Sequence, residues 1–410
     1  MAPPSPRPHH ARARAWAELL RLPALFTVPG DALAGAAAVS ARPTSRTLLA
    51  IASSLCLYEA GMALNDWADR DVDAVERPHR PLPSGRIRPA AALGAGCALT
   101  GAGLSLAACA GRPALTVAVP LAATVWAYDL ALKNTPAGPV AMATARGLDL
   151  LLGAAATAGA GVGRKVGAYP AWATAVADEP RVASGAAAVP RAVDGIRRSL
   201  SSAADLGARR TLRSAALLGI RQALPSALLL GAHTLAVTTV SRREAQGGSP
   251  LAPFAALAAT AALTRTVIRQ RSRSTDRSDG SRRGPGSRRP TDLAGLGAAA
   301  MSRLSHPPRQ TGDHVSPTGS GPEPLDTHAA LRLALAAAYA ATTARPYLHA
   351  TLNPSPPLTQ RAVTAGIRAT IPLQAALTAR SGAKGATVTA LLTTALAPLA
   401  GRFARKVSVT

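Results

Sequence analysis

Long uncharged stretches alternate with short charged turns along most of this sequence. A stretch of about 17–25 apolar residues is long enough to cross the hydrocarbon core of a bilayer as a helix. Nearly charge-free stretches of this kind occur at 22–39, 47–64, 89–110, 113–132, 135–162, 223–240, 250–263, 329–344, 362–379 and 386–400. The last two are ambiguous, so the pattern predicts nine or ten membrane helices. The expected fold is an all-α, polytopic membrane helix bundle.

The same alternation divides the chain into seven segments. Membrane helices are expected at 16–162, 222–268 (the sixth and seventh helices) and 328–401, with basic tails at 1–15 and 402–410. Segment 163–221 mixes Arg, Asp, Ser and Pro, and is predicted to be a basic insert outside the membrane. Segment 269–327 is rich in Arg and Ser. Such a low-complexity tract cannot bury a core, so it is predicted to be largely disordered.

The chain carries 46 Lys and Arg against 21 Asp and Glu, which gives a net charge of +25. This excess indicates an anionic partner, such as nucleic acid, anionic lipid or a diphosphate, or simply solvated Arg-rich loops. Aromatic side chains do not interleave with the Arg of the inserts, and base stacking would require them, so no nucleic-acid partner is expected. The three Cys lie in apolar runs and predict neither a disulfide nor a zinc site.

The placement of Arg predicts the orientation of the chain. Three Arg lie in 1–14 and five in the loop 65–88, whereas the short loops 41–46 and 111–113 carry fewer. Loops rich in Lys and Arg remain on the cytoplasmic side of a membrane. The N-terminus and the 65–88 loop are therefore expected in the cytoplasm, and the chain is expected to be a multi-pass protein of the cell membrane.

The most informative segment is Asn-Asp-Trp-Ala-Asp-Arg-Asp-Val-Asp at 65–73, where the second predicted span ends. In a helix, Asp66, Asp69 and Asp73 share one face, whereas Asp71 points away from it. Neighbouring like charges repel, but a hard divalent cation such as Mg²⁺ reverses that cost because it prefers oxygen ligands. Arg77 and Arg80 follow closely and suit the phosphate oxygens of a diphosphate. The alternative is a solvated, salt-bridged helix end.

These residues resemble the UbiA prenyltransferase family. Its first aspartate motif, NDxxDxxxD, is matched by Asn65, Asp66, Asp69 and Asp73, and Arg-Pro-x-Arg-Pro-Leu-Pro-Ser-Gly at 77–85 is also similar to that family. So is Tyr-Asp-Leu-Ala-Leu-Lys at 128–133. The resemblance implies transfer of a prenyl group from a prenyl diphosphate to a lipophilic, usually aromatic, acceptor.

The resemblance also implies a role for each matched residue. Asp66, Asp69 and Asp73 would hold Mg²⁺, and with Lys133 they form the predicted catalytic set. Asn65, Arg77 and Arg80 are predicted to bind the substrate. The lipid bilayer, the prenyl diphosphate and the acceptor are the expected partners.

The family's second motif, DxxxD, is not matched. At its place the chain reads His-Thr-Leu-Ala-Val-Thr-Thr-Val-Ser-Arg-Arg-Glu at 233–244, where only Glu244 can replace a carboxylate. The start of this segment and Asn-Pro-Ser-Pro-Pro-Leu-Thr-Gln at 353–360 are similar to a bacterial branch called EboC-like. The alternative hypothesis is a non-catalytic UbiA-like protein that binds or transports an isoprenoid or a pigment precursor.

Glu59, Arg146, Asp149 and His233 are ionisable residues within predicted spans, where charge is costly and usually paired or functional. Arg146 and Asp149 are three residues apart in the fifth span, and either line a substrate cavity or form a structural ion pair. His233 either polarises an acceptor hydroxyl or makes an interhelical hydrogen bond. Glu59 either faces the same cavity or pairs with an Arg. Arg146, Asp149, His233 and Glu244 complete the predicted substrate-binding set.

Overall fold

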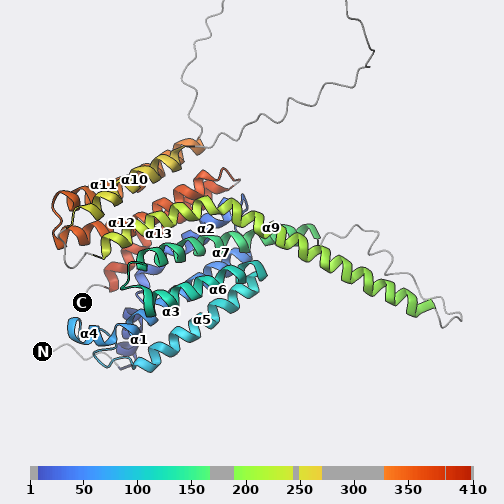
Figure 1. Cartoon of the computed structure of the whole chain (residues 1–410), viewed down its shortest axis with the longest axis horizontal. Coiled ribbons are helices and arrows are strands. Elements are labelled where there is room, and N and C mark those ends of the chain that lie inside the picture. Colours follow the sequence, from blue (N-terminus) through green and yellow to red (C-terminus); the bar gives the residue numbers. More distant parts are fainter. Residues whose placement is uncertain (1–7, 167–188, 243–248, 270–326, 384, 408–410) are drawn as a thin grey trace, which may run out of the picture. The chain divides into compact units, whose positions relative to one another are not determined.

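The structure is a computed structural model that describes residues 8–166, 189–242, 249–269, 327–383 and 385–407. All regular elements among these residues are helices, which confirms the all-α prediction (Figure 1). In chain order they are α1 (Pro8–Leu19), η1 (Leu22–Thr27), α2 (Pro29–Ala38), α3 (Ser45–Ala68), α4 (Arg70–Glu76), α5 (Pro89–Ala110), α6 (Arg112–Ala127), η2 (Tyr128–Leu132), α7 (Gly138–Val166), α9 (Val189–Ser241), α10 (Leu251–Ile268), α11 (Thr327–Leu352), α12 (Pro356–Arg380) and α13 (Ala386–Val407). The predicted insert at 269–327 lies almost entirely outside the described residues.

Six described helical stretches are long and apolar enough to cross a membrane. They are Ser45–Ala68, Pro89–Ala110, Arg112–Leu132, Gly138–Ala158, Ser214–Ser241 and Leu251–Ile268. Two shorter apolar helices, Leu25–Ala38 and Ala386–Leu396, accompany them. The stretch Ser214–Ser241 begins before residue 222, the predicted start of the sixth span, because α9 continues without a break across that boundary. The total of nine or ten spans stays a prediction.

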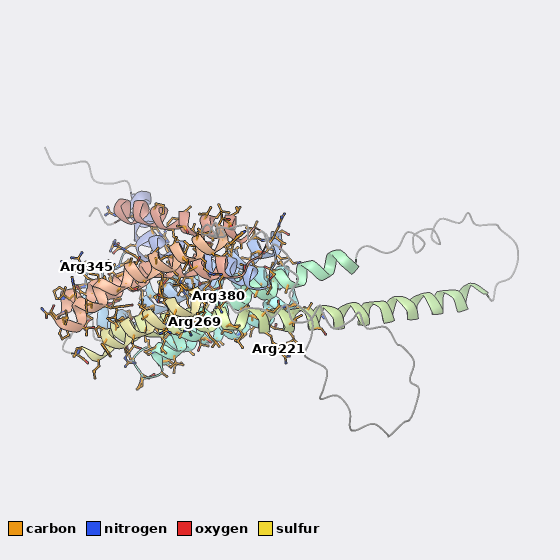
Figure 2. All side chains as sticks on the ribbon, turned by 90° about the horizontal axis from the view of Figure 1, so that it is seen from above. Arg221, Arg269, Arg345 and Arg380 are labelled. Atoms are coloured by element: carbon orange, nitrogen blue, oxygen red, sulfur yellow. The ribbon has the colours of Figure 1, made fainter. Side chains whose placement is uncertain are left out.

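Apolar side chains occupy both the interior and the outer surface of the bundle. The main core is built mostly of Ala and Leu from α3, α6, α7, α9, α12 and their neighbours. On α9, Leu217, Leu224, Leu228 and Leu235 are exposed at helical spacing, which suits contact with lipid. Figure 2 shows Arg345 and Arg221 toward opposite ends of the bundle in that view. This distribution is that of a membrane helix bundle.

Helices α2 and α7 approach each other so closely that only glycine fits at the contact. A Cβ atom at Gly153 would overlap the backbone of Ala32, and one at Gly35 would overlap the carbonyl of Leu150. Small residues at such crossings let backbones pack directly in membrane proteins. The crossing also brings together Asp31 on α2 and Arg146 on α7.

We expect Gly153→Ala to destabilise the bundle by about 1–3 kcal/mol, since the added methyl group must push two backbones apart. The control is Gly101→Ala in α5, where a Cβ would meet nothing within 4 Å. That change should leave stability within about 1 kcal/mol of the wild type. Thermal unfolding of the detergent-solubilised protein measures both, and equal midpoints for the two variants would contradict the close α2–α7 packing.

Candidate active site

The aspartate motif lies where α3 turns into α4. The chain bends at Asp69, yet the helical spacing of the backbone hydrogen bonds persists, because Asp69 N donates to Asn65 O (3.0 Å) and Asp73 N to Asp69 O (2.8 Å). Asp66 and Asp73 are consequently buried, at 4% and 2% exposure. The Asp71 side chain, in contrast, is 83% exposed, as its place off the shared face predicts.

Guanidinium groups surround the two buried carboxylates. Arg80 Nη1 lies 2.6 Å from Asp73 Oδ2 and 3.6 Å from Asp66 Oδ1, so it bridges both residues. Arg77 adds a contact of 3.4 Å to Asp73. Arg21, between α1 and η1, lies 3.0 Å from Asp66 Oδ1. The structure therefore brings the predicted residues Asp66, Asp73, Arg77 and Arg80 together.

Asp69 faces the opposite wall, formed by η2 and the residue after it. Its Oδ1 lies 2.5 Å from Lys133 Nζ. One helical turn before Lys133, Asp129 is 4% exposed and accepts a hydrogen bond from Asn65 Nδ2 (3.3 Å). Lys133 and Asp69 also interact electrostatically with Asp129. Asn65 and Lys133 thus both interact with an additional carboxylate, that of Asp129.

Among the described residues, no three His, Cys, Asp or Glu side chains converge closely enough to hold a metal ion. The carboxylates are instead bound to Arg or Lys. Their donor chemistry nevertheless fits Mg²⁺, because the motif offers carboxylate and amide oxygens alone. The ammonium of Lys133, between Asp69 and Asp129, already marks a place for positive charge.

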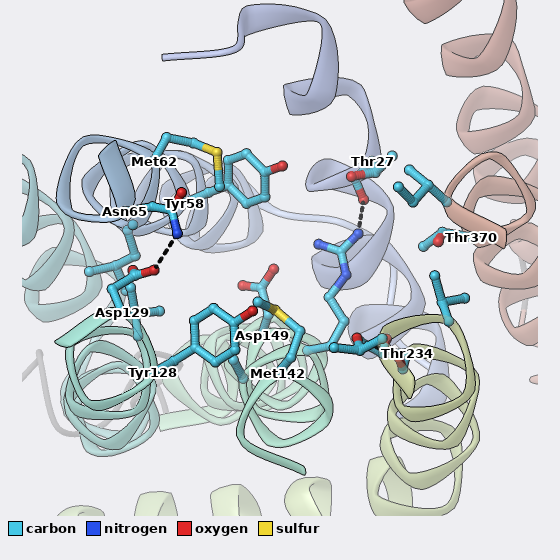
Figure 3. Close-up of a pocket in the computed structure, with 18 of the residues that line it drawn as sticks. Thr27, Tyr58, Met62, Asn65, Tyr128, Asp129, Met142, Asp149, Thr234 and Thr370 are labelled. Carbon is cyan, nitrogen blue, oxygen red and sulfur yellow. Dashed lines mark hydrogen bonds between the residues drawn. The ribbon is translucent and has the colours of Figure 1, made fainter. Parts of the chain in front are cut away.

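A cavity of about 470 Å³ begins beside the motif and continues into the bundle (Figure 3). One stripe of α3 lines it, with Ser54, Tyr58, Met62 and Asn65 at helical spacing. Residues of α6, η2, α7, α9 and α12 form the other walls. Ser54 and Asn65 are eleven residues apart, or about 16 Å along a helix. The cavity therefore extends well away from the motif.

The far end of this cavity is polar. Arg146 forms an ion pair with Asp31 (2.9 Å) and donates to the carbonyl of Thr27 (3.4 Å). Gln374 Nε2 donates to Asp31 Oδ1 (2.6 Å). Asp149 accepts a hydrogen bond from Ser54. Arg146 thus lines the cavity and is ion-paired, but its partner is Asp31 and not Asp149, and its role in substrate binding stays a prediction.

His233 lines the cavity but its ring nitrogens are both engaged. Nε2 lies 3.0 Å from the carbonyl of Gly366, which can only accept, so Nε2 carries the proton. Nδ1 then accepts from the hydroxyl of Tyr339 at 3.1 Å. This arrangement is the interhelical hydrogen bond that the sequence left as one of two possibilities.

Arg21 and Asp129 beside the motif, and Asp31 at the far end of the cavity, were not predicted from the sequence as site residues. A signal existed for Asp129, because it is the only charged residue within the apolar run 113–132. Glu59 is buried outside the cavity lining, and neither carboxylate oxygen has a hydrogen-bond partner in the described part of the chain. Glu244 lies outside the described residues.

Two curated relatives are digeranylgeranylglyceryl phosphate synthases. The protein of Methanopyrus kandleri is 36% identical over 150 residues, which cover 35% of this chain and 53% of that protein. The protein of Methanothrix thermoacetophila is 36% identical over 130 residues, covering 30% and 49%. The chain thus spans about half the length of these relatives. The chloroplastic chlorophyll synthase of Oryza sativa subsp. japonica is 45% identical over 58 residues, covering 14% and 15%.

A solved structure, the apo structure of a UbiA homolog from Aeropyrum pernix K1, resembles this chain with a TM-score of 0.48 and 16% sequence identity, covering 86% of this chain and 96% of that one. Residues 24–280 match the sequence profile of the UbiA prenyltransferase family. This match covers more than half of the chain, including the aspartate motif and Lys133. The chain belongs to the UbiA prenyltransferase family.

Proposed function

We propose that this chain is an intramembrane prenyltransferase. It moves a prenyl group from a prenyl diphosphate to a lipophilic acceptor, which the family resemblance suggests is aromatic. One observation supports this proposal above all: a cavity in the bundle, lined by Arg21, Asn65 and Asp129, adjoins a cluster of carboxylates, guanidiniums and an ammonium around the motif. That combination suits a diphosphate and its metal ion.

The proposed roles follow from the contacts. Asp66, Asp69 and Asp73 would hold Mg²⁺, which when bound neutralises charge on the leaving diphosphate. Lys133 and Arg80 each contact at least one of these carboxylates in the structure, and their side chains can turn to contact the phosphate oxygens instead. Arg77 and Arg21 add two further guanidiniums. Asn65 and Asp129 would add further side-chain oxygens on the side of the site that borders the cavity.

The cavity would then guide the reaction. The allylic carbon–oxygen bond breaks, the diphosphate keeps the electron pair, and the acceptor donates electrons to the prenyl carbon. Bond cleavage leaves an allylic carbocation. Leu57, Val125 and Val363 line the cavity and exclude water from this carbocation, while the rings of Tyr58 and Tyr128 face the same space (Figure 3). The proton that the acceptor loses requires a base. Asp129 and Asp149 are the carboxylates in the lining.

The direct test uses the full-length protein in lipid nanodiscs with geranylgeranyl diphosphate, Mg²⁺ and a lipid extract as the source of acceptors. We expect diphosphate release together with a prenylated product found by mass spectrometry, and neither in EDTA. Tight binding of the diphosphate without release would instead favour the non-catalytic, isoprenoid-binding alternative.

The proposal includes an orientation, with the N-terminus and the motif loop in the cytoplasm of a cell-membrane protein. Ser84 lies exposed in that loop. A cysteine at this position, with Cys56, Cys97 and Cys109 replaced, should resist an impermeant thiol reagent in intact cells. Labelling before permeabilisation would show that this loop lies outside the cell and that the proposed orientation is wrong.

A further inference from the structure

The inner half of the cavity contains buried charge that the transfer of a prenyl group does not itself require. Ser54 and Asp149 mark this end, about three helical turns of α3 away from Asn65. A prenyl chain gains nothing from such groups, because it has no polar atoms. The polar end of the cavity therefore fits the acceptor. The charges at this end determine which acceptors can bind there.

Arg146 contributes the only cationic side chain in the described lining of this inner end, and it is not available to an anion. Its guanidinium lies 2.9 Å from Asp31, and it also interacts electrostatically with Asp149. Asp31 is fully buried and is held in place by Gln374. Arg146 additionally donates to the carbonyl of Thr27. One cation thus faces two carboxyl groups and a carbonyl oxygen.

The charge of this set is bounded by its ion pair, because the contact between Arg146 and Asp31 keeps at least one of the two carboxyls ionised. With one of the two carboxyls ionised, Arg146, Asp31 and Asp149 sum to zero, and with both ionised they sum to minus one. In neither state is the inner end positive. A carboxylate or phosphate on the acceptor would lose its hydration and find no uncompensated cation, and it would meet like charge where both carboxyls are ionised.

A neutral or cationic acceptor meets favourable partners instead. Asp149 lines the cavity as a hydrogen-bond acceptor, and the hydroxyls of Thr234 and Thr370 lie on the walls opposite (Figure 3). Resting on the proposed transfer reaction, we propose that the acceptor is an uncharged or amine-bearing compound with hydroxyl or amino donors. Acceptors with a carboxylate or phosphate on the same ring or chain are excluded from the inner end.

Three probes with one ring and different charge test this proposal: 4-hydroxybenzyl alcohol, 4-hydroxybenzylamine and 4-hydroxybenzoate. Each is titrated into the full-length protein with Mg²⁺ and geranylgeranyl thiolodiphosphate, and binding is measured from the rise in unfolding temperature. We expect the alcohol and the amine to bind at least about tenfold more tightly than the carboxylate, because the inner charge is not positive. Equal affinities, tighter binding of 4-hydroxybenzoate, or binding by none of the three overturns the proposal.

A variant links the preference to the named carboxyl. Asp149→Asn keeps the shape and still accepts a hydrogen bond from Ser54, but it leaves Arg146 with Asp31 alone. The ratio of alcohol to carboxylate affinity should fall by about tenfold. Asp71→Asn makes the same chemical change on an exposed side chain and should leave the ratio unaltered. If Asp149→Asn folds and the ratio is unchanged, the assignment of the charge preference to Asp149 is overturned. If that variant does not fold, the affinities of the wild-type protein for the three probes decide the proposal alone.

These outcomes are distinct from a failure of the proposed function. If the transferase proposal is wrong, geranylgeranyl thiolodiphosphate binds independently of Mg²⁺ or no diphosphate is ever released. If only the acceptor class is wrong, metal-dependent diphosphate binding persists and the charge preference among the three probes is absent or reversed.

Discussion

Asp69→Asn is expected to weaken Mg²⁺-dependent binding of a non-hydrolysable prenyl diphosphate by about 10- to 100-fold, whereas Asp71→Asn should change it little. Asp69 contacts Lys133 at 2.5 Å in the centre of the site, and its replacement removes a charge while keeping the shape. An interaction with a charged group contributes roughly 1.5–3 kcal/mol, which corresponds to that range of affinity. Asp71 is exposed and contacts only its neighbour Arg70 among the ion pairs of the described residues.

The measurement is a titration of geranylgeranyl thiolodiphosphate into each purified variant, with Mg²⁺ and again with EDTA. Asp71→Asn is the matched control, because it makes the same substitution two residues away. Binding that ignores EDTA, or equal losses in the two variants, would remove the basis for a metal–diphosphate site at 65–73. Such a result would favour the salt-bridged helix end as the correct interpretation of the motif.

Asp129→Asn is expected to weaken the same binding by about tenfold or more and to abolish most diphosphate release. The family's second aspartate motif is not matched at its expected place, so a carboxylate from elsewhere is needed to complete the site. Asp129 is buried, accepts from Asn65 and interacts with Lys133 and Asp69. An Asn at 129 can still accept from Asn65, so the variant isolates the loss of charge.

Glu244→Gln provides the comparison, because the sequence indicates Glu244 as the other possible replacement for the missing motif. Loss of turnover with retained analogue binding in Glu244→Gln, together with near wild-type behaviour in Asp129→Asn, would assign the role to Glu244. We expect the reverse order. Both variants should keep the wild-type unfolding temperature within a few degrees for this comparison to be valid.

The sequence predicted the helical fold and the motif end of the site because both depend on local spacing. Carboxylates at helical intervals share a face in any helix, and this holds even though the chain bends at Asp69. Asp71 falls off that face for the same reason. The nearby Arg80 reaches Asp73 because only the end of α4 and a short turn that contains Pro78 separate them.

Contacts between distant segments could not be derived in this way. Arg146 pairs with Asp31 because α2 and α7 cross with glycines at the contact, which no spacing within either helix reveals. Arg21 meets Asp66 across 45 residues of chain, which is also a contact that local spacing does not reveal. The Asp129 signal was present as a single charge in an apolar run, but its partner Asn65 was not indicated.

The number of spans is difficult to predict because polar residues in this bundle often bond to their own helix. In α11 and α12, Thr342, Thr343 and Thr378 each donate to a carbonyl one turn earlier. Such hydroxyls need no outside partner and are compatible with lipid, yet they lower the mean hydropathy of the segment. These helices have 26 and 25 residues, which is long enough to span a bilayer, although their sequences are not uniformly apolar.

The mutual pairing of acids and bases around the motif has a thermodynamic consequence. A cation that arrives alone must displace Arg80 or Lys133 from the carboxylates, and a diphosphate that arrives alone must draw the same groups away from Asp73 and Asp69. When both arrive, each releases the partners that the other needs. On the proposed function, their binding is therefore expected to be cooperative, and linkage requires that each raises the affinity of the other by the same factor. Without prenyl diphosphate, the paired site is expected to resist occupation by stray ions.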